Sequence, residues 1–179
     1  MGRGANTAAG QATAQPTRGG GAHSEPLEAM HQALLTAKEL GNIAESVRSS
    51  VAHAGVKAGT PERKKLNRAV NMLRHYADLT ESALFLQLRD IRARCGEDLG
   101  PGEKHDKPLR YLGRGESSAE RAKNGVTDLG ERVRRLRELN ALVAHRTGSI
   151  LTARGVAESL QKVDRCVGQL NEVVAPLPA

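Results

Sequence analysis

The sequence predicts an all-α protein: a helical hairpin followed by one long C-terminal helix. Apolar side chains recur every three or four residues along most of the chain, which is helical spacing. Few segments carry the alternating, β-branched pattern of strands. The chain has one Phe, two Tyr and no Trp, so Leu, Val and Ala must fill the core, which suits helix-on-helix packing. We expect a coiled coil or bundle that packs with partner chains.

The first helix is expected over residues 25–54, after a disordered tail over residues 1–23. The tail contains almost no large apolar residue, so burial cannot offset the entropy lost on ordering. Ser24 is a candidate N-cap, with Pro26 in the first turn. Alanines and Gly41 then narrow the apolar seam of this helix, which allows another helix to approach closely.

The second helix is expected over residues 61–95, and it carries two apolar faces. Thr60 and Pro61 are a favourable start, because Thr can cap the helix and Pro at the first position loses no hydrogen bond. A short connection before them predicts that the first two helices form a hairpin. One neighbouring helix cannot cover both faces. The second face repeats every seven residues and contains Met72, Leu79 and Leu86.

A loop is expected over residues 96–116, since its glycines and prolines exclude a long regular element. Its apolar residues Leu109, Tyr111 and Leu112 either fold back onto the protein or dock on a partner. Ser117 and Glu120 form a capping box.

The capping box opens a helix expected over residues 118–147, and the apolar pattern resumes over residues 149–174. No Pro separates these two stretches. A Gly costs only about 1 kcal/mol in a helix interior relative to Ala. The sequence therefore favours one long helix, continuous or kinked near Gly148, that completes a helical domain over residues 24–175.

Candidate partner-interface residues lie on the second face of the 61–95 helix, in the loop and along the C-terminal helix. If the C-terminal helix runs straight past the hairpin, both helices keep an uncovered apolar face. The candidates are Met72, Leu79, Leu86, Leu109, Tyr111, Leu112, Ile150, Leu160, Val163, Val167 and Leu170.

The sequence contains no pattern typical of a catalytic, cofactor or metal site. None of the six histidines pairs with another three or four residues away, as a helical metal site requires. Cys95 and Cys166 are far apart and lack metal-ligand spacing, so we expect two reduced, core-facing thiols. No nucleophile elbow or phosphate loop occurs in a suitable context. We therefore expect a protein that is not an enzyme and uses no cofactor or metal.

The formal net charge of +7 is compatible with nucleic acid, anionic lipid or an acidic protein as a partner. Arginines cluster between Arg132 and Arg137, but acidic residues are interspersed and aromatic residues for base stacking are nearly absent. A solvated helix face is therefore favoured over direct nucleic-acid contact. No apolar run approaches the roughly 20 residues that a transmembrane helix needs.

The order of these sequence features resembles that of a known protein family. A small-residue tail leads into a helical hairpin whose second helix ends in Leu88-Arg89-Asp90-Ile91-Arg92-Ala93-Arg94-Cys95. A loop with Pro108-Leu109-Arg110-Tyr111-Leu112 and a long charged helix follow. Over residues 27–144 this order is similar to subunit 30 of the Mediator complex of RNA polymerase II transcription. The Arg/Ala/Gly-rich composition and the apolar stretch over residues 150–174 depart from that family.

The resemblance implies a non-enzymatic, nuclear subunit of a transcription coactivator, held by coiled-coil contacts with other helical subunits. It brings no catalytic residues. The alternative hypothesis is a free-standing helical bundle, cytosolic or secreted, that acts as a bacterial effector or binds membrane surfaces.

Overall fold

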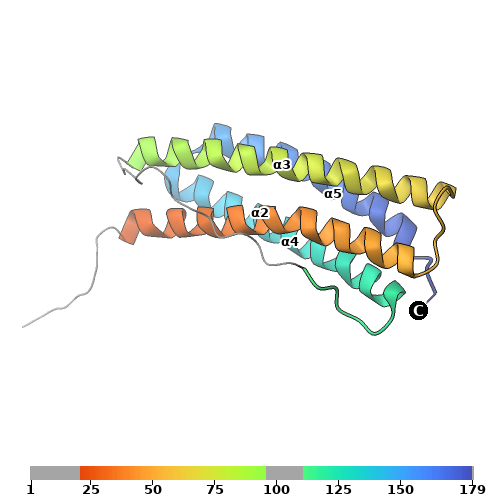
Figure 1. The fold of residues 1–179 in the computed structure, drawn as a ribbon. Coiled ribbons are helices and arrows are strands. Elements are labelled where there is room, and N and C mark those ends of the chain that lie inside the picture. The colour runs from red at the N-terminus through yellow and green to blue at the C-terminus, as the bar shows by residue number, and fades with distance from the viewer. Residues whose placement is uncertain (1–20, 96–110, 179) are drawn as a thin grey trace, which may run out of the picture.

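The computed structural model describes residues 21–95 and 111–178, which form a four-helix bundle (Figure 1). The helices are α2 (Gly21–His53), α3 (Pro61–Cys95), α4 (Ser118–Thr147) and α5 (Ile150–Val174). The two described segments contain no strand. The predicted all-α fold class is therefore confirmed.

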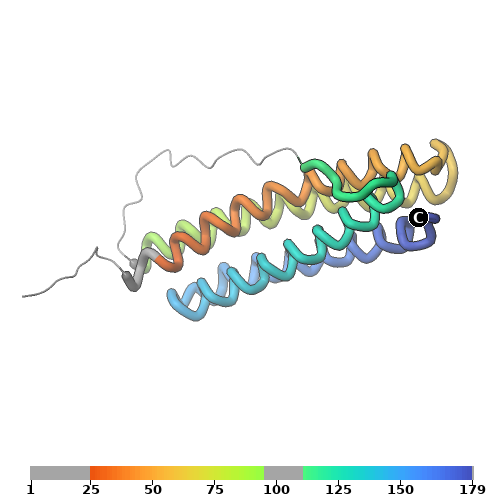
Figure 2. Tube along the Cα trace, turned by 90° about the horizontal axis from the view of Figure 1, so that it is seen from below, coloured from red at the N-terminus to blue at the C-terminus, as the bar shows by residue number. Residues whose placement is uncertain are grey.

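Each helix packs closely against two others, so the four helices form a ring in the order α2, α3, α5, α4. α2 and α3 form one antiparallel hairpin, and α4 and α5 form a second (Figures 1 and 2). α3 ends and α4 begins at opposite ends of the bundle. A long connection between two hairpins is one of the usual ways to build such a bundle.

Local capping signals set the starts of α3 and α4. The Thr60 hydroxyl oxygen accepts a hydrogen bond from the Arg63 backbone N–H at 3.2 Å, and Ser117 accepts one from the Glu120 N–H at 3.0 Å. These contacts satisfy N–H groups that the first turn of a helix leaves unpaired. α3 and α4 therefore begin directly after a residue whose hydroxyl oxygen accepts a hydrogen bond from the first turn.

The start of α2 differs from the expectation. The helix begins at Gly21, four residues earlier than predicted, so Ser24 lies inside it and is not its N-cap. Pro26 is the sixth residue of α2 and so lies inside the helix, where it has no N–H to donate to the carbonyl four residues earlier. Residues 21–23 of the predicted disordered tail are thus helical, and residues 1–20 lie outside the described part of the chain.

The prediction of one long C-terminal helix is wrong, because the chain reverses direction at Gly148. This residue has a φ of 73°, in the left-handed region, and its N–H bonds to the Ala144 carbonyl at 2.9 Å. Glycine adopts this conformation at little cost, and it ends a helix rather than kinking it. α5 then runs back along α4 and also packs against α3.

The reversal places most of the apolar face of α5 inside the chain's own core. Four residues predicted to contact a partner are instead buried by α3 and α4, with exposed fractions of 0 to 8%. They are Leu160, Val163, Val167 and Leu170. The prediction that they form a partner surface is wrong for the folded chain, because it depended on a helix that continued past Gly148.

α2 and α4 approach each other closely at Gly125. A Cβ atom added there would lie 2.6 Å from Cγ2 of Val47 on α2. Real side chains do not tolerate such a distance, and the branched Val47 side chain has little freedom to rotate away. A glycine is therefore needed at this crossing. Gly41, which the sequence suggested for this role, lies in ordinary contact with Arg74.

Several polar side chains lie within the apolar core. The Thr80 hydroxyl donates to the Ser159 hydroxyl at 2.9 Å, which links α3 to α5. The Asn140 amide donates to the Ala153 carbonyl at 2.9 Å, which links α4 to α5. Gln87 on α3 is fully buried, but its Oε1 and Nε2 atoms have no hydrogen-bond partner among the described residues. Leaving a buried polar group unpaired costs stability.

Candidate functional site

The second apolar face of α3 remains exposed after the bundle closes. Met72, Leu79 and Leu86 are 38%, 42% and 56% exposed, and we call these three residues the α3 row. They are spaced by seven residues, so they lie on one side of the helix. A row of large apolar side chains left in solvent is typical of a contact surface.

The α3 row is exposed because the two neighbours of α3 cover other sides of this helix. α2 packs on one side, where Lys38 and Glu81 form an ion pair at 3.2 Å. α5 packs on the other side, where Ser159 bonds to Thr80. Tyr76 and Ala83 lie beside the row but pack partly into the core. The row thus faces outward between the sides of α3 that α2 and α5 cover, and Phe85, next to Leu86, is also 43% exposed.

Charged side chains line both ends of the α3 row. Arg68 and Arg89 are exposed and form no ion pair with any residue that the structure describes. Arg68 lies one helical turn before Met72, and Arg89 one turn after Leu86, so both share the side of the helix that carries the row. The Lys162 ammonium lies 5.6 Å from the centre of the Tyr76 ring, which places another cation beside the row.

The other predicted interface residues lie in different places. Ile150 is 53% exposed at the start of α5, and Leu112 is 75% exposed in the segment before α4. Tyr111 folds back onto the bundle instead of pointing into solvent. Leu109 lies outside the described residues. The structure therefore brings Met72, Leu79 and Leu86 together as one surface and does not join Leu112 or Ile150 to it.

Tyr111 is held by a buried carboxylate that sequence reasoning missed. Its hydroxyl donates to Oδ2 of Asp128 on α4, and Arg114 donates to Oδ1 at 2.7 Å. Asp128 is only 6% exposed, and hydrogen bonds to a buried carboxylate are needed to offset its desolvation. The signal available in the sequence was the aromatic ring in an otherwise polar loop. The segment that contains Tyr111 and Arg114 is thus fastened to α4.

The pKa of Tyr111 offers a test of this attachment. Burial of the ring, followed by the hydrogen bond and negative charge of Asp128, raises the pKa of Tyr111 from 10.0 to about 12. A folded-state pKa above the unfolded value means that the contact stabilises the fold fully below about pH 10. This stabilisation is lost as the pH rises towards 12.

We expect ultraviolet titration of the phenolate in a Tyr76→Phe variant, whose only tyrosine is Tyr111, to give a midpoint near 12. Adding Asp128→Asn should lower that midpoint, because it removes the negative charge beside the hydroxyl. A midpoint near 10 in both variants would contradict the contact.

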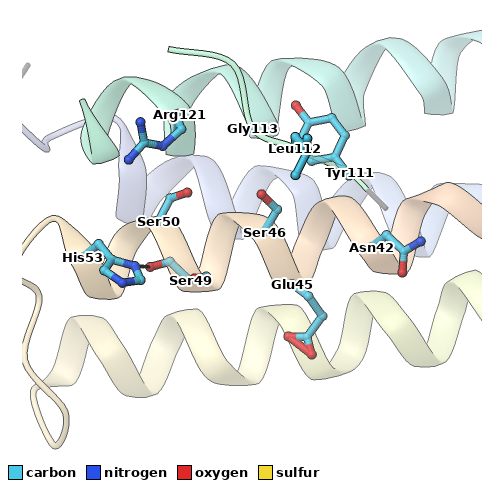
Figure 3. A pocket seen from close by; sticks show the side chains of 10 residues that line it. All are labelled: Asn42, Glu45, Ser46, Ser49, Ser50, His53, Tyr111, Leu112, Gly113 and Arg121. Carbon is cyan, nitrogen blue, oxygen red and sulfur yellow. Dashed lines mark hydrogen bonds between the residues drawn. The ribbon is translucent and has the colours of Figure 1, made fainter. Parts of the chain in front are cut away.

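A polar groove opens beside this segment, along the C-terminal half of α2 (Figure 3). Its volume is about 660 Å³, and its lining residues come from α2, from the segment before α4 and from the first turns of α4. They are Asn42, Glu45, Ser46, Ser49, Ser50, His53, Tyr111, Leu112, Gly113 and Arg121.

The charged groups of the groove are already engaged by the protein. Glu45 accepts hydrogen bonds from Arg48 and Arg74, and Arg121 donates to the Gly115 carbonyl at 3.1 Å. Nδ1 of His53 lies 2.8 Å from the Ser49 backbone carbonyl (Figure 3). The arrangement provides a polar surface whose carboxylate and guanidinium groups already contact other groups of the chain.

The arginines of α4 are mostly paired with acidic side chains. Arg132 bonds to Glu39 of α2 at 3.1 Å, Arg134 to Glu138 at 3.1 Å, and Arg137 to Asp164 of α5 at 3.5 Å. Exposed pairs of this kind add little stability. They leave less free positive charge for phosphate groups than the sequence cluster suggested.

The described residues include no group of three or more His, Cys, Asp or Glu side chains that could hold a metal ion. No helix in this part of the chain is both long and apolar enough to span a membrane. Cys166 is buried, and burial raises the pKa of its thiol. The side chain of Cys95 lies outside the described part.

No protein-family model, curated protein sequence or solved structure matches this chain.

Proposed function

We propose that this chain is a non-enzymatic interaction protein that offers the α3 row to a helix of another subunit in a multi-protein complex. The observation that supports this proposal is that Met72, Leu79 and Leu86 stay exposed at heptad spacing along the middle of α3, whereas the large exposed apolar residues of α5, Ile150 and Leu151, lie only in its first turn. A helix laid along the row would cover it in the manner of a coiled coil.

The setting that we propose is a Mediator-type transcription coactivator in the nucleus. The order of sequence features supports this part of the proposal, and its partners would be other helical subunits. Direct contact with nucleic acid is not part of the proposed role, because the arginines of α4 are largely engaged with acidic side chains.

Replacing Leu79 by Asp tests the role of the row. We expect the full-length variant to lose its partner, since truncating or charging a central interface residue typically costs about 2 kcal/mol or more. Folding should change by only about 1 kcal/mol, as is usual for partly exposed positions. Ala141→Asp is the matched control, because Ala141 is exposed on α4, which contacts α3 only weakly.

The measurement is the size of the native assembly, and the partners that co-purify, for tagged wild type and both variants. The proposal predicts loss of the assembly in Leu79→Asp alone. An assembly that survives Leu79→Asp unchanged would exclude the α3 row as its contact surface.

A second candidate function, that of a free-standing helical bundle, is favoured because the chain forms its own apolar core. Four helices bury one continuous apolar cluster without another chain, which supports a free-standing bundle that acts as an effector or binds membrane surfaces. Flotation with vesicles that contain or lack anionic lipid distinguishes the two candidates. Flotation with anionic vesicles only would support the second candidate, and no flotation with either kind would exclude its membrane-binding form.

A further inference from the structure

We infer that the occupant of the α3 row is an acidic amphipathic helix of at least six turns. This inference rests on the proposed function and adds the chemistry of the partner. It depends on the charges that surround Met72, Leu79 and Leu86, and on their positions along α3.

α3 carries a surplus of positive charge. It has eight Lys or Arg residues and four acidic residues. Ion pairs engage two of those acids, and they also engage the cations Lys65, Arg74 and Arg94. Glu81 pairs with Lys38 of α2, and Asp90 pairs with Arg94 at 3.0 Å. Asp90 also accepts from the Thr152 hydroxyl at 3.1 Å.

Cations without ion pairs outnumber such acids over the exposed sides of α3 and α5. Within the described residues, the cations are Lys64, Arg68, Arg89, Arg154, Lys162 and Arg165, and the acids are Glu62, Asp78 and Glu158. The surface around the row therefore carries a net positive potential, which favours a partner of opposite charge.

Arg68 and Arg89 define the length of the partner helix. They are separated by 21 positions, or about 32 Å at the helical rise of 1.5 Å per residue. Covering them with an uncharged helix would remove water from two guanidinium groups without providing an acceptor. A helix with apolar residues over the row and carboxylates near both ends would satisfy both requirements.

A second copy of this chain is less suitable than an acidic helix. Each copy would bring the same surplus of positive charge to the interface, and a parallel pair of α3 helices would place Arg68 and Arg89 opposite themselves. Like charges placed across an interface oppose association. The charge pattern thus favours a different, acidic chain over self-association.

Two synthetic helical peptides provide the test. Both carry the same heptad stripe of leucines, and the positions beside the stripe are Glu in one peptide and Lys in the other. We expect fluorescence anisotropy with the full chain to show at least tenfold tighter binding of the Glu peptide. The preference should shrink as salt is added, because the charges are partly exposed.

An Arg68→Glu/Arg89→Glu double variant should reverse the preference between the peptides. Both side chains are exposed and unpaired within the described residues, so the helical circular dichroism should remain. The matched control is Lys57→Glu/Lys123→Glu, which changes the net charge equally in the turn before α3 and on α4 and should keep the preference for the Glu peptide.

The possible results separate the two proposals. Equal binding of both peptides, lost in Leu79→Asp, would overturn the acidic partner and keep the α3 row as a contact surface. Binding of the Glu peptide that is unaffected by Leu79→Asp, or no binding of it at all, would contradict both. A stable dimer in light scattering that Leu79→Asp dissociates would make a second copy the occupant and overturn the acidic partner.

Discussion

Replacing Leu160 by Ala is expected to lower the free energy of unfolding by about 2–5 kcal/mol, the usual cost of emptying space in a packed core. Leu160 is fully buried between α5 and the rest of the bundle. The effect requires only the isolated chain, because the side chains around Leu160 belong to the chain itself. Urea unfolding followed by circular dichroism measures it.

Leu151→Ala is the matched control for this experiment. Leu151 lies on the same helix but is 76% exposed, so the same substitution should change stability by no more than about 0.5 kcal/mol. A large difference between the two variants is expected if α5 folds back after Gly148. Two equally small effects would mean that α5 does not pack into the core of the isolated chain.

Replacing Gln87 by Met is expected to raise stability by about 1–3 kcal/mol, the cost ascribed to a buried polar group without a partner. Gln87 is fully buried, and neither polar atom of its amide has a hydrogen-bond partner within the described residues. Met has a similar length and a similar helix propensity, so the main change is the removal of the amide.

Thermal and urea unfolding of Gln87→Met should both move towards higher stability. Gln161→Met is the control, because Gln161 is exposed on α5 and its amide is solvated in both states. We expect no more than about 0.5 kcal/mol of change there. A loss of stability in Gln87→Met would show that the Gln87 amide is hydrogen-bonded in solution.

Local signals in the sequence predicted the helices better than their arrangement. Thr60 and Ser117 mark the starts of α3 and α4 because a capping hydroxyl acts within one turn. Gly148 was ambiguous, since a glycine can stay inside a helix or end it. The apolar pattern continues across Gly148 because α4 and α5 run in opposite directions along the same core and both contribute apolar residues to it.

The candidate site was predictable only in part, for the same reason. The heptad spacing of Met72, Leu79 and Leu86 identified a face that one neighbour could not cover, and this face is exposed. The burial of the apolar face of α5 depends on the reversal at Gly148. Leu160 was therefore predicted to face a partner, whereas it lies in the core. Asp128 was missed because its partners, Tyr111 and Arg114, come from outside its own helix.

Site-specific photo-crosslinking from position 79 tests most directly whether the α3 row contacts another chain. A photoreactive residue is placed at position 79 in the full-length protein, and separately at position 141 on the exposed side of α4. A partner that docks on the α3 row should give one dominant protein adduct from position 79 and none above background from position 141. No adduct from position 79, or the same adducts from both positions, would mean that the α3 row is not a contact surface.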